Sequence, residues 1–354
     1  MLRTKKVFID TECYVRNHLN FDNPSFSSFK SLCDEDELEH ITTTVVCREV
    51  ERKIQESTKE ALDALKTFKR KAQPLNNIDY KDFSSLFSNV DDNEALDKAL
   101  NSFRTFINDT SAEIVEAYSV DCEEILDRYF QTEPPFTKDK SNEFRDAISL
   151  SVLKTHLEGQ LAYVVSEDKI LKDYCEEDEL LVYVESLPKL LDLYSATNER
   201  TAKLKAFINA KHDVLTKLID EYISECDVYN ASTWEDAEVD GFTITDVHLF
   251  DTSVLSINDS DATVEIVARV QMNVGVTGPD FNNGTYDKED GIMYTFGSSS
   301  QVVERDFEFD VNLIVDYDYD ADSEEIVEAD FTILIEEASN GIEVDVEENE
   351  PDYY

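Results

Sequence analysis

Short apolar runs that alternate with helical patterns are the feature that most constrains the fold of the first 230 residues. Three runs, residues 6–10, 161–165 and 180–184, are rich in Val, Ile, Leu, Phe and Tyr and are too short for helices. Strands that are apolar on both faces are typical of a parallel sheet covered by helices on both sides. We therefore predict an α/β fold. Helical spacing of apolar residues marks the covering helices as residues 45–72, 94–108, 113–130, 141–157 and 187–223.

A change in composition near residues 228–240 predicts a second domain. Residues 231–354 hold 33 acidic and 3 basic side chains, whereas residues 1–230 hold 46 and 29. In the second segment apolar residues alternate with polar ones over residues 242–249, 263–276, 302–319 and 326–335, and turn signals such as Asn283-Gly284 separate these runs. This pattern predicts an antiparallel sheet with one packed face and one acidic face.

The expected organisation is an α/β domain over residues 1–228 and an acidic, β-rich domain over residues 229–354. The core of the first domain spans residues 5–195, and a helical extension continues to about residue 228. The residues beyond 343 are acidic, and we expect them to form a frayed tail.

Charge, glycine motifs and cysteines narrow the classes of function. The chain carries 79 acidic and 32 basic residues, a net charge of −47, which disfavours non-specific binding of nucleic acid. A catalytic metal ion can screen this charge locally, so a nuclease is not excluded. The glycine-rich phosphate-binding motifs are absent, and the six cysteines form no CxxC pair, which favours reduced thiols in the cytoplasm. The sequence contains neither an apolar run of membrane-spanning length nor a signal-peptide core, so we expect no membrane association.

Four acids fall where the active site of such a sheet would lie. Asp10 ends the first strand and Asp168 follows the second, while Glu49 and Asp146 lie in the first turns of two predicted helices. Active sites of open α/β sheets form beyond the carboxyl ends of the strands. Four carboxylates that converge there would bind Mg²⁺ or Mn²⁺, hard cations that take oxygen ligands and activate water for phosphodiester hydrolysis.

Three of these acids also have a structural explanation. Glu49 fits a solvated helix surface, Asp146 a residue that stabilises a helix N-terminus, and Asp168 the N-cap of a helix at residues 169–175. Asp10 is the exception, because a carboxylate that abuts a buried strand needs partners. Spacing alone leaves both explanations open for the other three.

The residues around the four acids form motifs that occur in a defined order. These are Val7-Phe-Ile-Asp-Thr11, Val46-Cys-Arg-Glu-Val50, Pro134-Pro-Phe followed by Glu143-Phe-Arg-Asp-Ala147, and Val164-Val-Ser-Glu-Asp168. Together they resemble the four acidic motifs of PIN-domain nucleases, most of all a PIN-like subgroup in which Pro-Pro-Phe precedes a Lys-x-x-Glu-Phe-x-Asp-Ala helix. The resemblance covers about residues 5–195.

The resemblance implies a three-layer αβα sandwich and a metal-dependent nuclease that usually acts on single-stranded or structured RNA. Asp10, Glu49, Asp146 and Asp168 match the family's metal-binding acids, so the resemblance implies that they hold Mg²⁺ or Mn²⁺ and carry catalysis. The small polar neighbours that it places beside these acids are Thr11 and Ser166.

One departure from the family's pattern concerns a second metal ion. Many PIN domains carry an acid two residues after the last motif aspartate, where this chain has Ile170. Asp173 lies one turn further along, where a helix would point it elsewhere. We therefore expect one firmly held ion, with a second recruited by substrate.

Three further residues near the acids are expected to support them. Glu143 lies three residues before Asp146 and shares its helix face, so we assign it a supporting position rather than a role as ligand. Arg145 and Lys140 lie in the same segment, where they would grip substrate phosphates or pair with local carboxylates.

The leading hypothesis is a cytoplasmic metal-dependent endonuclease that cleaves RNA in preference to DNA, in a toxin or phage-defence setting that the resemblance suggests. The acidic domain would then inhibit the nuclease or recruit a basic partner. The alternative is a catalytically inert PIN-like scaffold that displays its acidic β domain to a protein or mimics nucleic acid. A phosphatase of small phosphate esters is a third hypothesis, and the sequence is compatible with an oligomer.

Overall fold

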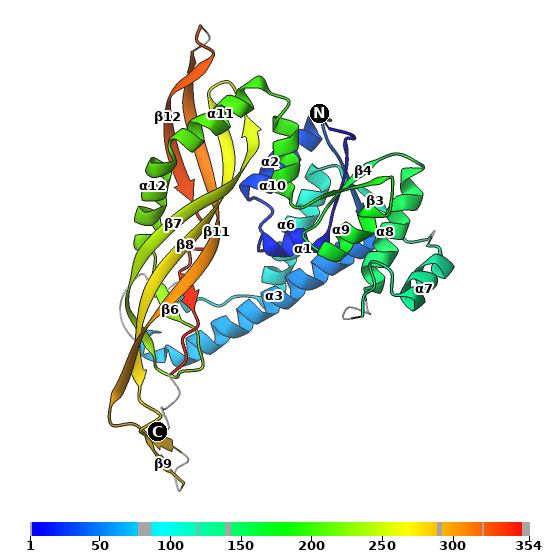
Figure 1. Cartoon of the computed structure of the whole chain (residues 1–354). Helices are drawn as coiled ribbons and strands as arrows, with labels where there is room; N and C mark the ends of the chain where they lie inside the picture. Colours follow the sequence, from blue (N-terminus) through cyan, green and yellow to red (C-terminus); the bar gives the residue numbers. More distant parts are fainter. Residues whose placement is uncertain are drawn as a thin grey trace. The chain divides into compact units, whose positions relative to one another are not determined.

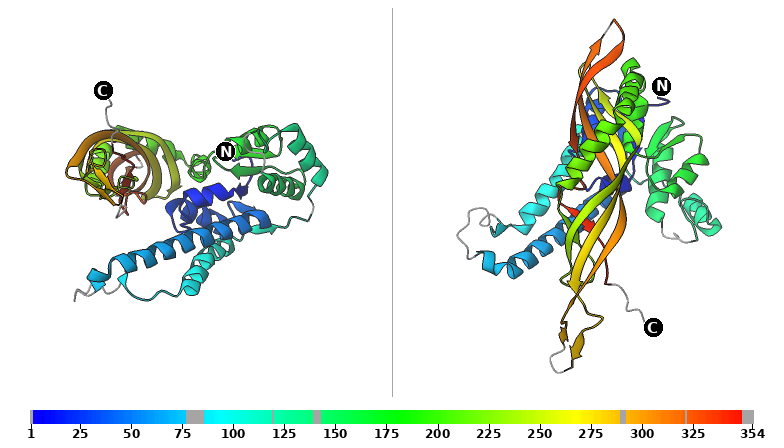
Figure 2. Two further views of the ribbon diagram at one scale, coloured as in Figure 1. Left: turned by 90° about the horizontal axis from the view of Figure 1, so that it is seen from below. Right: turned by 60° about the vertical axis from the view of Figure 1, so that its left-hand side comes forward.

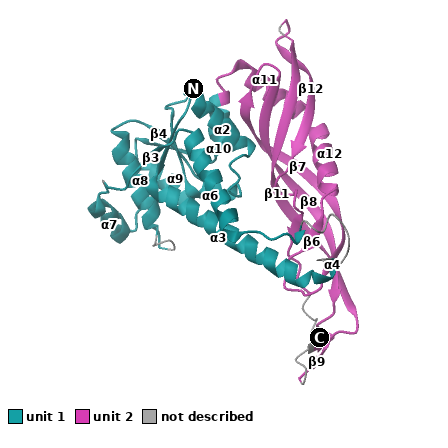
Figure 3. Cartoon of the chain, turned by 180° about the vertical axis from the view of Figure 1, so that it is seen from behind, with its two compact units in different colours: residues 1–194 teal, residues 195–354 magenta. Residues whose placement is uncertain are grey.

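The computed structural model divides into two compact units, residues 1–194 and residues 195–354 (Figure 3). The described residues are 2–76, 86–118, 120–138, 143–288, 292–320 and 322–348.

Unit 1 is built on a parallel sheet of five strands, as the apolar runs predict (Figure 1). The central strand β1 has β2 on one side and β4 on the other, and its residues Val7, Phe8 and Ile9 are buried. Strands that bury both faces need helices on both sides, and the chain supplies them between the strands. In order across the sheet the strands are β3 (Glu113–Val115), β2 (Glu39–Thr43), β1 (Lys6–Ile9), β4 (Ala162–Val165) and β5 (Leu181–Val184).

The helices of unit 1 follow the predicted pattern with one correction. Residues 113–130 are not one helix, because the β-branched residues Ile114 and Val115 pair with β2 as the edge strand β3. The helix of this segment begins only at Cys122. The helices are α1 (Thr11–Arg16), α2 (Pro24–Asp34), α3 (Thr44–Lys71), α4 (Gln73–Asn76), α6 (Asp92–Asp109), α7 (Cys122–Gln131), α8 (Phe144–Leu157), α9 (Lys169–Glu176) and α10 (Leu187–Ser195).

Helix α3 is much longer than the sheet that it covers. Its buried residues Val46, Val50 and Ile54 all lie in its first three turns, where it packs on the sheet. The rest of α3 extends beyond the sheet with α6 beside it (Figure 2). The N-terminal part of α3, which is the rigidly packed part, therefore carries Glu49.

A buried aromatic cluster joins α1, α2 and α6 to the sheet. The ring of Tyr14 lies 5.4 Å from that of Phe26 and 6.0 Å from that of Phe106, centroid to centroid. The Tyr14 hydroxyl lies 3.3 Å from Nε2 of His40, whose Nδ1 lies 2.8 Å from the Thr110 hydroxyl. Burial lowers the pKa of His40 to about 3, so this imidazole is neutral and structural.

Unit 2 is built on four long antiparallel strands, which confirms the predicted β-rich domain. Two helices lie along one face of the sheet (Figure 2). Apolar side chains of β8 and β11 alternate toward the face that these helices cover, and acids lie on the opposite face. Two smaller strand pairs, β6 with β13 and β9 with β10, complete the unit. The elements are α11 (Glu199–Ala210), α12 (His212–Ser224), β6 (Val228–Asn230), β7 (Glu238–Ile257), β8 (Asp261–Pro279), β9 (Thr285–Asp287), β10 (Ile292–Tyr294), β11 (Ser298–Asp320), β12 (Glu325–Leu334) and β13 (Ile342–Val344).

The division between the units corrects the expected boundary at 228/229. Helices α11 and α12 belong to unit 2, because their apolar residues Leu204, Leu215 and Ile219 are buried in the cores of the antiparallel sheet. Charge alone could not reveal this, since both helices carry basic residues and resemble the first segment in composition. The boundary therefore lies after Tyr194.

The expected frayed tail is also corrected up to residue 348. Ile342, Val344 and Val346 are buried in the core of unit 2. Asn230 fixes this segment, because its side chain donates to the Val346 carbonyl at 3.0 Å and accepts from the Val346 backbone N–H at 3.0 Å. Alternating apolar residues outweigh the acidic composition of this segment.

A close approach of Trp234 to β8 gives a test of the packing in unit 2. The indole N–H of Trp234 donates to the Pro279 carbonyl at 2.9 Å, and a Cβ atom at Gly278 would lie 2.6 Å from the indole ring. We expect Gly278→Ala to lower the free energy of unfolding by about 1–2 kcal/mol, because the ring must move. Urea denaturation measures this change. The matched control is Gly241→Ala, where a Cβ would meet no atom of the described residues within 4 Å, so a similar loss there would contradict the packing.

Candidate carboxylate site

Asp10 lies where β1 ends, beside the end of β4. Its backbone N–H continues the ladder by donating to the Val165 carbonyl at 3.0 Å, and the Ser166 hydroxyl donates to Oδ2 of Asp10 at 3.1 Å. The residue is only 8 % exposed. Burial raises the pKa of Asp10 to about 6, against the opposing effects of hydrogen bonds from the Thr11 backbone and the Ser166 hydroxyl. Ser166 therefore supplies the hydrogen-bond partner that the buried Asp10 carboxylate needs.

Glu49 reaches the same edge of the sheet from α3. The Thr43 hydroxyl caps this helix by accepting from the Val46 N–H at 3.2 Å, which sets the direction of its first turns. The Thr11 hydroxyl donates to Oε2 of Glu49 at 3.1 Å, and Nη1 of Arg145 lies 2.5 Å from Oε1. The solvated-helix explanation for Glu49 is therefore wrong, since its side chain is 14 % exposed and engaged at both oxygens.

Asp146 completes a group of neighbouring carboxylates from the first turn of α8. Its pKa is raised to about 8, first by burial and then by the charges of Asp10, Glu143 and Glu49 and a hydrogen bond with Glu143. A hydrogen bond between two carboxyl groups requires a proton on one of them. The raised pKa of Asp146 therefore indicates that these carboxylates lie close enough to repel one another.

Packing of the Pro-Pro-Phe motif positions the start of α8. The ring of Phe136 is buried and lies 4.9 Å from that of Phe144, the first residue of the helix. Asp146 follows Phe144 by two residues, so this aromatic contact holds the turn that carries the carboxylate. The Pro-Pro-Phe motif thus positions Asp146 through packing, a role that the sequence alone did not reveal.

Asp168 serves as the N-cap of α9. Its Oδ1 accepts from the Ile170 N–H at 2.7 Å, and its own N–H donates to the Ser166 hydroxyl at 3.1 Å. Ser166 thus links the backbone of Asp168 to the carboxylate of Asp10. The capping explanation for Asp168 is realised, and its assignment as a fourth metal ligand stays a prediction.

The supporting residues behave differently from one another. Glu143 is half-buried beside Asp146, whereas Arg145 pairs with Glu49 rather than standing unpaired toward a substrate. Asp173 is exposed on α9, as its helical position predicts. Lys140 lies outside the described residues.

Two residues that the sequence did not single out also lie near this edge. The charge of Glu12, in the first turn of α1, helps to raise the pKa of Asp10. Burial first, and then nearby acids that include Asp168 and Glu12, raise the pKa of Tyr183 to about 12. The only signal for Glu12 was its place two residues after a motif acid, and Tyr183 gave none.

The chemistry of the donor set fits a hard divalent cation. Carboxylates that repel one another at a water-accessible edge are the ligands that Mg²⁺ and Mn²⁺ prefer, and a bound cation would remove the repulsion. The arrangement is not that of a ready-made centre: among the described residues, no three His, Cys, Asp or Glu side chains form a group that could already hold an ion. Glu49 is instead neutralised by Arg145.

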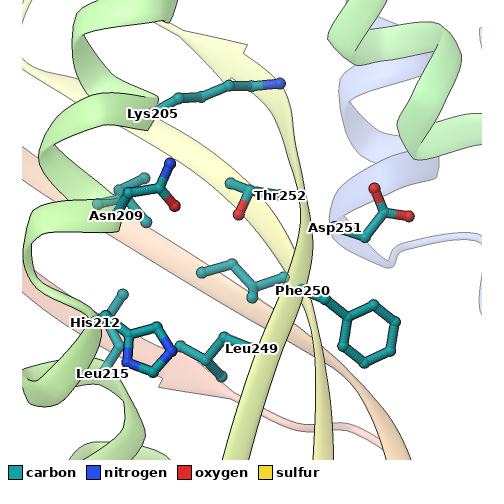
Figure 4. A pocket seen from close by; sticks show the side chains of 10 residues that line it. Lys205, Asn209, His212, Leu215, Leu249, Phe250, Asp251 and Thr252 are labelled. Atoms are coloured by element: carbon teal, nitrogen blue, oxygen red, sulfur yellow. The ribbon is translucent and has the colours of Figure 1, made fainter.

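A hollow in unit 2 is the competing candidate for a binding site (Figure 4). It has a volume of about 300 Å³ and lies between β7 and the helices α11 and α12. The polar groups of Asn209 and His212 point into it, whereas the carboxylate of Asp251 points away. It offers nitrogen donors over an apolar floor rather than convergent carboxylates, so the edge of the sheet in unit 1 is the better candidate for phosphodiester chemistry.

Comparison with known protein families gives a match over nearly half of the chain. A family model described as PIN domain matches residues 7–170, a range that includes all four motif acids. None of the curated proteins and none of the solved structures matches the chain. In the described part of the chain, no helix is both long and apolar enough to cross a membrane.

Proposed function

We propose, from the membership of residues 7–170 in the PIN domain family, that this protein is a metal-dependent endonuclease that cleaves RNA in preference to DNA. The family consists mainly of metal-dependent nucleases. The observation that carries the proposal is the pair of contacts that join these acids at the carboxyl edge of the sheet: Thr11, next to Asp10, donates to Glu49, and Arg145, next to Asp146, pairs with Glu49. The family's chemistry needs carboxylates at that edge.

Asp10, Glu49 and Asp146 would hold Mg²⁺ or Mn²⁺, with Asp168 as a fourth ligand. When bound there, the cation would supply the Lewis acidity and the lowered pKa of water that phosphodiester hydrolysis needs. The hydroxyl groups of Thr11 and Ser166 orient the carboxylates of Glu49 and Asp10. In the absence of a cation, a proton on Asp146 relieves the repulsion within the group.

The acidic unit would regulate this activity. Residues 231–354 hold 33 acidic and 3 basic side chains, and much of the charge lies on the exposed face of the sheet that includes β11. Such a face repels nucleic acid and attracts a basic protein. We propose that the acidic unit recruits a basic protein or inhibits the nuclease, in a cytoplasmic toxin or phage-defence setting.

An inert PIN-like scaffold is the second candidate, and specific observations favour it. The Arg145 guanidinium forms an ion pair with the Glu49 carboxylate, and Ile170 lies where many PIN domains have an acid. In that case the neutralised carboxylates would be structural and the acidic unit would be the functional part.

Cleavage of end-labelled RNA and DNA in Mn²⁺ tests the proposal. We expect RNA cleavage that falls at least about a hundredfold when EDTA removes the metal, because the metal supplies several kcal/mol of stabilisation in the transition state. A screen of small phosphate esters separates a phosphatase from a nuclease. If RNA and DNA remain intact in both Mg²⁺ and Mn²⁺ while the protein is folded, the inert scaffold is the better description.

A further inference from the structure

The Glu49 carboxylate is the point of contact between the candidate metal site and a cationic side chain of the same chain. Nη1 of Arg145 lies 2.5 Å from Oε1 of Glu49, and the Thr11 hydroxyl donates to Oε2. The two partners differ in exposure, because the Arg145 side chain is 50 % exposed and that of Glu49 is 14 % exposed. The carboxylate is therefore held inside, and the guanidinium reaches it from the solvent side.

The position of Arg145 on α8 places this cation beside the carboxylates that would bind a metal. It immediately precedes Asp146, whose pKa reflects the charges of Asp10 and Glu49. A guanidinium this close neutralises the charge of the Glu49 carboxylate and repels a divalent cation, so the two cations compete for it. The guanidinium can exchange, because half of the Arg145 side chain is exposed and water can solvate it when it leaves the carboxylate.

We propose that Arg145 is the exchangeable counter-cation of Glu49: it competes with the divalent ion for this carboxylate and so sets the metal affinity of the site. This inference rests on the proposed function. It explains why the carboxylates lie together in unit 1 and yet form no ready-made metal group among the described residues. A displaced guanidinium stays beside Asp146 at the surface, where it can contact a phosphate of the substrate in bidentate fashion.

The Mn²⁺ affinity of Arg145→Gln, measured by isothermal titration calorimetry on the full chain, tests the proposal. We expect Mn²⁺ to bind about tenfold more tightly, because the competing positive charge is gone. Arg145→Lys keeps the charge and should bind within about threefold of the wild type. In Arg145→Gln the Michaelis constant for RNA should rise several-fold although Mn²⁺ binds more tightly, because the guanidinium that contacts the substrate phosphate is gone.

A second arginine–glutamate pair, between Arg104 of α6 and Glu51 of α3, supplies the matched control. Nη2 of Arg104 lies 2.9 Å from Oε1 of Glu51, and the Arg104 side chain is 54 % exposed. Arg104→Gln therefore removes a similarly exposed arginine that pairs with a glutamate of the same helix, α3, but leaves Glu49 untouched. Its Mn²⁺ affinity should stay within about twofold of the wild type.

The outcomes separate this inference from the proposed function. If Arg145→Gln is folded by circular dichroism and binds Mn²⁺ no more tightly than the wild type, the competition is disproved, while metal-dependent cleavage by the wild type keeps the nuclease standing. If Asp10→Asn leaves Mn²⁺ binding unchanged, the metal is bound elsewhere and both are overturned.

Discussion

Replacement of Asp10 by Asn is expected to reduce Mn²⁺-dependent RNA cleavage by about 10³-fold, the largest effect of any single substitution in this chain. Asn keeps the shape of Asp and a carbonyl oxygen that can accept from the Ser166 hydroxyl. It removes the negative charge from a residue that is 8 % exposed and that contributes to the raised pKa of Asp146. The substitution therefore removes a metal ligand with little disturbance of packing.

The control for this substitution is the next acid along the chain. Glu12→Gln removes a charge that also influences Asp10, but from an exposed position in the first turn of α1. We expect its cleavage rate, measured with the same labelled RNA, to stay within about threefold of the wild type. If Asp10→Asn and Glu12→Gln lose activity equally, general electrostatics rather than ligation explains the effect, and the assignment of Asp10 fails.

The parallel sheet and the positions of its acids could be predicted from the sequence because both depend on local patterns. A short buried strand identifies itself by its apolar residues, and a motif acid at its end is fixed by the covalent chain. Asp10 and Ser166 then lie side by side because β1 and β4 are neighbours with Ile9 opposite Val165. Because neighbouring parallel strands end at the same edge of the sheet, the residues that follow them must lie close together.

The partners of the acids could not be predicted, because they depend on side-chain directions between distant segments. The sequence left open whether Arg145 contacts substrate phosphates or pairs with a local carboxylate. Only the relative placement of α3 and α8 shows that it pairs with Glu49. For Asp168 the sequence offered the N-cap of a helix at residues 169–175 as one of two explanations, and only the bond from the Ile170 N–H to Oδ1 shows that the cap is formed. Both contacts have energies of about 1 kcal/mol, which leave no mark on hydrophobic periodicity.

In unit 2 strand β7 is much longer than the alternation predicted, because bulges interrupt the alternation. The prediction covered residues 242–249, whereas β7 spans Glu238–Ile257. The register of β7 against β8 shifts at several points, such as between Phe250 and Thr252, where Asp251 has a positive φ of 58°. Each bulge adds one residue and reverses the alternation, so several bulges break the period-two pattern although the strand continues.

The pH dependence of stability provides a test of the carboxylate group that does not require activity. The pKa of Asp146 is about 8 in the folded protein, against an ordinary value of 3.8. A carboxyl group whose pKa is raised on folding stabilises the fold most below pH 3.8, and that contribution is lost as pH rises toward 8. Asn has no such loss. In EDTA we therefore expect Asp146→Asn to gain about 2–4 kcal/mol in free energy of unfolding relative to wild type between pH 4 and pH 8.5.

Urea denaturation at each pH measures this difference, and Asp173→Asn is the matched control because Asp173 is an exposed helical aspartate of unit 1. Its difference from wild type should change by less than about 0.5 kcal/mol over the same range. Mn²⁺ should reverse the order at pH 8.5, since a cation that binds only the folded wild type stabilises it by mass action and Asp146→Asn has lost a ligand. A difference for Asp146→Asn that is as flat as the control would mean that Asp146 does not lie among repelling carboxylates in solution. The nuclease proposal would then lose this support and rest mainly on the match of residues 7–170 to the PIN domain model.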